Sequence, residues 1–489
     1  MYRVHQTPRF RVLSKQQIKM IYRATLECLN RTGVDVHNAR ARELLVRAGA
    51  RQDGIRVRIP PHVIQDAVAA NPRSFTLWAR PEGEKRRQDP RLRMEIVPGR
   101  TYFGAGPTCT YFVDPYSGER RKARRGDPAH AARVSDALDN IDYVMGLGII
   151  DDVPHRLSPV YEFAEMVANT TKPVLPWAYS VDNVSDIYHM ALAVAGSEEA
   201  LQARPFLALF ATFQSPLVQT DEDLANAFWA ADHGLPVIFV GGGAAGMTAP
   251  VTGAASLVIS LAGALTSLAI VQLHRRGAPV CIGGVPQAMD LRTARPSYGA
   301  PEMSLYSAAM ADVARYLDLP FMGTAGASEA KTLDLQAAIE STFQVVVSGL
   351  SAATLIHDVG FLDCAEIGSL ESLVMNDEII SMSRWLLRGI EVSDETLMLD
   401  LIDEIGPGGE FISAKDTARR CRLEIWQPNL MDRQAWALWE AEGAPTTAQR
   451  IRRRLLDILE NHQPPPLPGG AAAQIETILG AAERGQHAR

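Results

Sequence analysis

Residues 319–331 read LPFMGTAGASEAK and contain the pattern that decides the fold. An apolar run is entered through Pro320 and left through glycine and other small residues, and Glu329 and Lys331 follow. A short apolar run with such boundaries is typical of a strand that is buried on both faces, as in a parallel sheet. The stretch therefore predicts a buried strand whose carboxyl end carries a carboxylate and an amine.

Runs of the same form recur through the middle of the chain. Helix-like stretches such as YSAAMADVARYLD separate them, and strands that alternate with helices indicate parallel βαβ units. The eight predicted strands are 101–103, 143–149, 173–178, 206–211, 236–240, 279–282, 320–323 and 353–357. Eight such units over about 280 residues predict a closed (β/α)8 TIM barrel. A doubly wound sheet is the competitor, but no GxGxxG follows the first strand, and GGGAAG at 241–246 is a poor match.

The flanks differ from the barrel in pattern. Helical stretches are expected at 16–32, 39–48 and 61–70, and β-like pieces at 74–79 and 92–97. We expect an N-terminal α+β cap (1–100), the barrel as catalytic domain (101–378) and a C-terminal helical extension (379–463). Residues 464–489 begin with a Pro- and Gly-rich stretch, which predicts a linker followed by a disordered tail.

Composition limits the class of protein. A formal charge of −7 gives no sign of a nucleic-acid surface. The five cysteines are scattered without a CxxC, which favours a reducing cytoplasm, and the N-terminal residues lack the apolar region of a signal peptide. The uncharged stretch 249–273 is about long enough to span a bilayer. Because it is rich in Ala, Gly, Ser and Thr, we expect a helix packed inside a soluble fold and no membrane role.

In this fold the active site forms at the carboxyl ends of the strands. The chain has no HExxH, no clustered zinc ligands and no GxSxG elbow, so we expect no metal of its own and no serine nucleophile. The predicted strand ends instead carry aromatic side chains and carboxylates, the groups that bind a quaternary ammonium cation. These are Trp177, Tyr179, Phe213, Tyr298 and Phe361 with Glu329, Asp358 and Glu366, beside Gln214 and His357. Any single aromatic residue among them is as readily explained by core or lid packing.

Glycines also mark two of the predicted strand ends. Gly241, Gly242, Gly283 and Gly284 are candidate cofactor-binding residues. They fit a phosphate cradle, and they fit equally well a large flat ligand pressed against the backbone.

Several long stretches resemble one known family. They include LNRTGVDVHNARARELLVRAGA, FGAGPTCTYFVDPYSGERRKA, FMGTAGASEAKTLDLQAAIES and ATLIHDVGFLDCAEIGSLESLVMNDE, and the resemblance runs from about residue 17 to residue 380. The sequence is similar to the trimethylamine methyltransferase family of corrinoid-dependent methyltransferases. The resemblance implies transfer of a methyl group from an N-methylated amine to the cobalt of a separate corrinoid (cobalamin) protein, with no tightly bound cofactor on this chain.

The resemblance also narrows the expected substrate. One branch of the family carries pyrrolysine in the late barrel, near Glu329–Lys331, whereas this chain has only standard residues. That departure favours the non-pyrrolysine branch and a quaternary amine such as glycine betaine. At the mouth of the predicted barrel we expect catalytic roles for His357 and Glu329 and substrate contacts for Trp177, Tyr179, Phe213, Gln214, Lys331, Asp358 and Glu366.

Local geometry gives further expectations. Trp177 and Tyr179 are two residues apart, so strand alternation points both to one side, whereas the adjacent His357 and Asp358 should diverge. Lys331 should begin the next helix and pair with Glu329, which makes the two part of the site wall. Two other functions stay open: a barrel lyase or aldolase that uses Lys331, and a non-catalytic betaine-binding protein. A structural His357 bonded to the backbone also stays open, as does a homo-oligomer.

Overall fold

The computed structural model describes residues 9–81 and 93–486. The first eight residues, where no signal peptide was expected, lie outside this part, as do Leu92 of the predicted 92–97 strand and the last three residues of the predicted tail.

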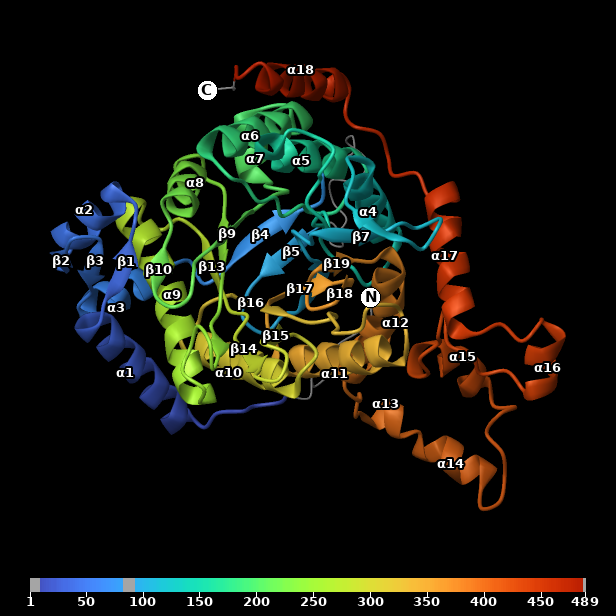
Figure 1. Ribbon diagram of the computed structural model, residues 1–489. Helices are drawn as coiled ribbons and strands as arrows, with labels where there is room; N and C mark the ends of the chain where they lie inside the picture. Colours follow the sequence, from blue (N-terminus) through green and yellow to red (C-terminus); the bar gives the residue numbers. More distant parts are fainter. Residues whose placement is uncertain (1–8, 82–92, 487–489) are drawn as a thin grey trace.

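The centre of the molecule is the predicted (β/α)8 barrel (Figure 1). Six strands run parallel in the order β6-β17-β16-β13-β11-β9. Isolated parallel bridges from Gly104 to Tyr143, from Val144 to Val174 and from Val174 to Leu207 close the ring through two further positions. The six strands are β6 (Tyr102–Ala105), β9 (Leu209–Thr212), β11 (Val237–Val240), β13 (Val280–Gly283), β16 (Phe321–Thr324) and β17 (Leu355–Val359).

The second and third predicted strands, 143–149 and 173–178, contribute only isolated bridges, among them one from Gly148 to Cys109. Pro173 and Pro176 donate no backbone hydrogen bond to a ladder. Leu147 has a φ of 61°, which interrupts extended backbone in the second segment. The chain therefore keeps the place of each strand in the ring but not its regular pairing.

Helices surround the barrel in chain order. Their caps follow from the sequence: Thr220 accepts a hydrogen bond from the backbone N–H of Asp223, and acidic residues occupy the first turn of the helix that follows. The surrounding helices are α4 (Gly126–Ala137), α5 (Ser158–Ala168, preceded by the 3-10 turn η3, His155–Leu157), α6 (Val181–Ala195), α7 (Glu198–Ala203), α8 (Asp221–Asp232), α9 (Gly253–His274), α10 (Pro301–Tyr316), α11 (Leu335–Ser351) and α12 (Leu370–Leu387).

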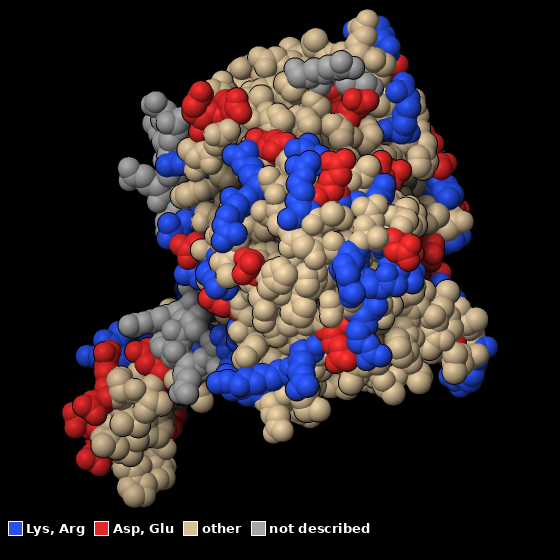
Figure 2. All heavy atoms as spheres, turned by 90° about the vertical axis from the view of Figure 1, so that its left-hand side faces the viewer, with Lys and Arg blue, Asp and Glu red and all other residues tan. Residues whose placement is uncertain are grey.

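Helix α9 is the uncharged stretch that could have spanned a membrane. It is the one helix of the described residues long and apolar enough to do so, and 78% of its most apolar window is buried. The N-terminal helices pack against it, and the face of the molecule that they form carries charged side chains of both signs (Figure 2). The expectation that this helix is packed inside the fold is thus met. The N-terminal elements are α1 (Lys15–Arg31), β1 (Val34–Val36), α2 (Ala39–Arg47), β2 (Arg51–Asp53), β3 (Arg56–Arg58) and α3 (Pro61–Ala70), and β1 also pairs with β10 (Val218–Gln219) of the barrel.

A hairpin closes the end of the barrel where the strands begin. Its strands are β4 (Phe75–Trp78) and β5 (Arg93–Ile96). Leu77, Met94 and Ile96 are buried and pack in one cluster with side chains from the barrel strands. The opposite end, where the strands finish, is left for the site.

Two small sheets lie beyond the carboxyl ends of the strands. One contains β12 (Ala244–Ala245), β14 (Gln287–Asp290) and β15 (Arg295–Ser297), and the other contains β7 (Tyr111–Val113), β8 (Arg120–Lys122), β18 (Phe361–Leu362) and β19 (Ile367–Gly368). The guanidinium of Arg295 lies 3.0 Å from the carboxylate of Asp363, which joins the two sheets.

The C-terminal part is helical, as expected. The predicted boundary at residue 378 falls inside α12, and four short helices beyond it bury no side chain: α13 (Asp394–Leu397), α14 (Leu399–Ile405), α15 (Lys415–Glu424) and α16 (Trp436–Ala441). Helix α17 (Thr447–Asn461) returns to the barrel.

Of the linker and disordered tail expected over 464–489, the tail needs correction, whereas residues 464–470 form no helix or strand. Residues Ala471–Glu483 form α18, which packs on α5 and α6. Ala471, Ile475, Leu479 and Ala482 are buried there. Their spacing forms one apolar face, and burial of that face keeps the helix on the barrel.

Candidate active site

An aromatic wall leads from the buried interior of the barrel to the surface at its open end. Trp177 and Tyr179 meet edge to face with ring centroids 4.7 Å apart, as their spacing in the sequence predicted. His155 stacks on Tyr179 at 4.8 Å, and its Nε2 lies 3.2 Å from the Tyr179 hydroxyl. Trp177 belongs to the cluster of buried side chains inside the barrel, and Tyr179 packs against that cluster. Together these three rings form a surface on which a cation can bind.

A carboxyl group that the sequence analysis did not single out lies behind this wall. Glu162 of α5 is 1% exposed, and its Oε2 accepts a hydrogen bond of 3.0 Å from the Trp177 indole N–H. Burial raises the pKa of Glu162 to about 8, although the indole and the backbone of Gly146 act in the opposite direction. A neutral acid therefore lies beside the aromatic wall at neutral pH.

His357 and Asp358 at the end of β17 do not diverge as expected. The imidazole Nδ1 lies 2.5 Å from the Asp358 carboxylate, and the Thr324 hydroxyl donates to the same carboxylate at 2.6 Å. Asp358 has a φ of 74°, and the pairing of β17 with β6 shifts register between Ile356 and Val359. This bulge removes the strand alternation on which the expectation depended. The pair is buried, and the alternative of a His357 bonded to the backbone finds no support in these contacts.

Several polar atoms near this end are buried without a hydrogen-bond partner among the described residues. They include Nε2 of His357, the hydroxyl of Tyr143 and Oε1 of Gln287. The His357 ring packs edge-on against Phe210, which belongs with Tyr143 to the cluster inside the barrel. Burial raises the pKa values of Tyr143 and Tyr298 well above the usual tyrosine value, with a further contribution from the Asp358 charge. Orphaned buried polar atoms are uncommon, so each of these is a candidate contact for a polar ligand.

Glu329 and Lys331 are close in space, but the predicted pairing of their side chains is wrong. Glu329 Oε1 accepts hydrogen bonds from the backbone N–H groups of Tyr298 (2.5 Å) and Gly299 (3.1 Å). Lys331 donates to the backbone carbonyl of Glu329 at 2.6 Å and pairs with the Asp363 carboxylate at 3.2 Å. Lys331 also precedes helix α11, which begins only after the N-cap Asp334. Glu329 therefore holds the segment that carries Tyr298, and Lys331 holds the β18–β19 hairpin.

Other expected site residues lie apart from the aromatic wall. Phe213 is buried against Gly241 and against Gly263 of α9, in the layer between strands and helices. Gln214 is exposed in a tight turn, where its backbone pairs with Val218. Glu366 lies in the β18–β19 turn, and its backbone carbonyl accepts from Tyr111. These positions make Phe213 a packing residue, while contacts of Gln214 and Glu366 with a ligand stay predictions.

The four glycines predicted to bind a cofactor are explained by packing within the chain. A Cβ at Gly241 would lie 2.5 Å from the Phe213 carbonyl oxygen, and one at Gly242 would lie 2.3 Å from that of Val285. At Gly283 and Gly284 the nearest atoms are side chains of Val240 and Met310. The close approach that only glycine permits is thus made by this protein's own atoms, and a contact of these residues with a cofactor stays a prediction.

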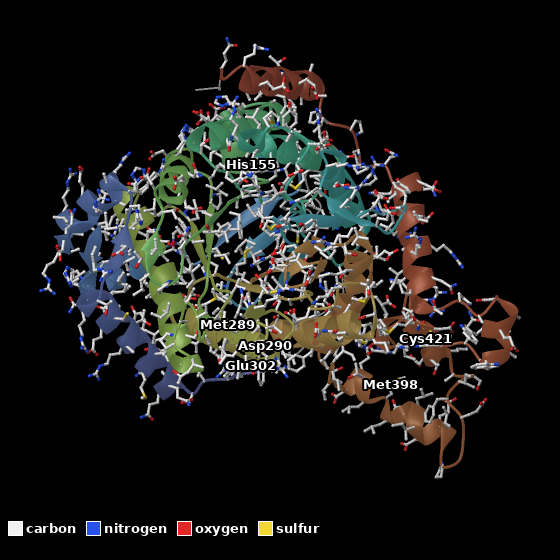
Figure 3. The ribbon with its side chains drawn as sticks, viewed as in Figure 1. His155, Met289, Asp290, Glu302, Met398 and Cys421 are labelled. Carbon is white, nitrogen blue, oxygen red and sulfur yellow. The ribbon has the colours of Figure 1, made fainter. Side chains whose placement is uncertain are left out.

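Figure 3 places the site in the molecule. His155 lies on the side of the barrel formed by α5 and α6, and Asp290 and Glu302 lie on the side formed by α10. Among the described residues, no group of three or more His, Cys, Asp or Glu side chains is arranged to hold a metal ion.

The relationship to known proteins agrees with this architecture. Residues 1–482 match the family described as "Trimethylamine methyltransferase (MTTB)". The chain belongs to the trimethylamine methyltransferase family. A trimethylamine methyltransferase of Desulfitobacterium hafniense (strain DSM 10664 / DCB-2) is 31% identical over 95% of this chain and 92% of its own length. A glycine betaine methyltransferase of Desulfitobacterium hafniense (strain Y51) is 27% identical over 98% of both chains.

A solved structure supports the fold of this family member. The crystal structure of the Methanosarcina barkeri monomethylamine methyltransferase matches with a TM-score of 0.50 and 11% identity, over 92% of this chain and 89% of that one. At this identity the likeness concerns the fold alone, and it agrees with the barrel described above.

Proposed function

We propose that the protein transfers a methyl group from a quaternary amine, with glycine betaine as the first candidate, to the Co(I) of a corrinoid carried by a separate protein. The observation that carries this proposal is the wall of Trp177, Tyr179 and His155, which runs from the buried Trp177 to the exposed His155 at the open end of the barrel, with Glu162 behind Trp177. Aromatic faces bind quaternary ammonium groups through their negative ring faces. Family membership supports the methyl transfer. The proposed location of the protein is the cytoplasm.

The chemistry needs few groups from the protein. When a methyl group leaves a quaternary nitrogen, the C–N bond breaks and its electron pair stays on nitrogen, so a neutral amine departs without help from an acid. The methyl carbon forms its new bond to the acceptor cobalt of the partner. The site therefore contributes orientation and a wall that tolerates a cation. We assign the buried His357–Asp358 pair to the other end of the substrate, where a carboxylate would lie.

The direct test uses the purified chain with free cob(I)alamin and a series of methylated amines. Formation of methylcobalamin, followed by its absorbance, should occur with a quaternary amine and should exceed that with trimethylamine. Tight binding of the same amines without any methyl transfer would leave the non-catalytic binding protein as the better explanation.

The aromatic wall predicts a loss of affinity shared by all cationic substrates. Trp177→Ala should weaken the binding of glycine betaine and of choline alike, by about 1–2 kcal/mol, because both present the same ammonium group. Isothermal titration calorimetry measures both values, and the melting temperature checks the fold. An unchanged affinity in a folded variant would make Trp177 a core residue only.

The lyase or aldolase alternative depends on Lys331. A lysine that forms a Schiff base needs an apolar pocket that lowers its pKa, whereas the Lys331 side chain is 61% exposed and paired with Asp363. Lys331→Met should therefore change methyl transfer by less than about threefold, since exposed ion pairs contribute about 1 kcal/mol or less. Borohydride with candidate carbonyl substrates should trap no adduct on Lys331, and an adduct there would favour the alternative.

A further inference from the structure

Glu162 has no part in the methyl transfer described above, yet it occupies a position that costs free energy. Its side chain leaves α5 and ends behind Trp177, where one oxygen accepts from the indole. The other oxygen lies over Gly146, where a Cβ would come within 2.3 Å of it, and it has no side-chain partner among the described residues. Burial of a carboxyl group with so few hydrogen-bond partners costs free energy. A function of the group would explain why it is buried there.

We propose that Glu162 is the counter-charge of the cation site, which holds a proton while no cation is bound and releases it when a quaternary ammonium group binds against Trp177. The inference rests on the proposed function in one respect only, that the ligand is a cation. It adds a group that selects for positive charge, in addition to the shape of the aromatic wall.

The surroundings of Glu162 support this exchange. Burial is the main cause of its raised pKa, and no charged side chain contributes to the shift, so no cation of the protein competes for the role. A cation over the Trp177 ring would lie within about 6 Å of the ring centre, and the indole is one hydrogen bond from the carboxyl group. In a buried site such a charge favours the ionised carboxylate and lowers its pKa.

The same coupling has a consequence for turnover. Methyl transfer converts the cation into a neutral amine and leaves the Glu162 carboxylate buried without its counter-ion. An unpaired buried charge is costly, so the carboxylate takes up a proton again and the neutral product is released.

Two other titratable groups face this region and must be separated from Glu162. The Tyr179 hydroxyl has its pKa raised, chiefly by burial, and His155 lies against it. A proton exchange that originates in either group would persist when Glu162 is replaced by glutamine. The isosteric Glu162→Gln keeps an acceptor for the indole and cannot ionise, which makes it the matched variant.

The test is calorimetric and needs no corrinoid. Glycine betaine is titrated into the full chain at about pH 7 in two buffers with different ionisation enthalpies, and the difference gives the protons released per ligand bound. We expect close to one proton for the native protein and none for Glu162→Gln. The control ligand is 3,3-dimethylbutanoate, in which carbon replaces the ammonium nitrogen without a change of shape, and it should release none.

The dependence of affinity on pH gives a second readout. At pH values below the pKa of Glu162 in the ligand-free protein, the Kd for glycine betaine should fall by up to about tenfold for each unit by which the pH rises. In Trp177→Phe, which keeps a ring but loses the indole N–H, this window should move to higher pH. Equal enthalpies in both buffers for the native protein, or undiminished proton release in a folded Glu162→Gln, would overturn the inference.

The outcomes separate this inference from the proposed function. Proton-linked binding of the cation without methyl transfer would refute the function and leave the role of Glu162 in place. Methyl transfer without proton release would refute the role of Glu162 and leave the proposed function in place.

Discussion

Glu162→Gln should stabilise the protein increasingly as pH rises, by roughly 4 kcal/mol between about pH 5 and pH 8 relative to the native chain. The pKa of Glu162 is raised from 4.5 to about 8 in the folded protein because the carboxyl group is buried. Between these two values the folded state keeps a proton that the unfolded state has released. The stability that this proton contributes is complete below about pH 4.5 and is lost as pH rises through 8.

Urea denaturation at several pH values measures the effect. The free energy of unfolding of the native protein should fall relative to that of the glutamine variant across this window, whereas groups common to both cancel in the difference. Glu165→Gln is a control on the same helix, because Glu165 is less buried and pairs with Arg125 at 2.8 Å. A difference between Glu162→Gln and the native protein that does not vary with pH would contradict a raised pKa at this position.

The contrast between these two glutamates shows how far the sequence predicts the site. Both lie in one helix-like stretch, three residues apart, and a helical pattern alone gives them similar standing. Glu162 reaches Trp177 only because the backbone of residues 143–149 passes beside it, and because Gly146 in that segment has no side chain to block the carboxyl group. That contact joins three successive elements whose residues are 15 or more positions apart, and no local pattern encodes it.

The barrel itself was predictable because each strand is a local apolar run with proline or glycine at its boundaries. The packing of α18 was not, since a proline-rich stretch precedes it and its short apolar face becomes visible only against α5 and α6. Tyr143 could have been found, because it opens the second predicted strand. The pairing of His357 with Asp358 could not, because it depends on a left-handed aspartate inside a strand, a conformation that Asp tolerates but does not require.

His357→Ala should weaken the binding of glycine betaine by about 2–4 kcal/mol, because the buried substrate carboxylate loses its hydrogen-bond donor. The imidazole Nδ1 is bonded to Asp358, while Nε2 is buried and has no partner among the residues described. Nε2 is therefore the ring nitrogen that is left for a ligand. A histidine with a hydrogen on each ring nitrogen donates to Asp358 through Nδ1 and to a substrate carboxylate through Nε2.

Choline distinguishes this role from a structural one. It carries the same trimethylammonium group but no carboxylate, so its affinity should change by less than about threefold in His357→Ala, since it never used the charged hydrogen bond. His357→Gln keeps a donor near the same place and should recover part of the glycine betaine affinity. Trp177→Ala, in contrast, should weaken the binding of both ligands. The two variants together therefore assign the ammonium end and the carboxylate end of the substrate. Equal losses for both ligands in His357→Ala, or a melting temperature that falls without selective loss of binding, would instead make His357 a structural residue of the barrel.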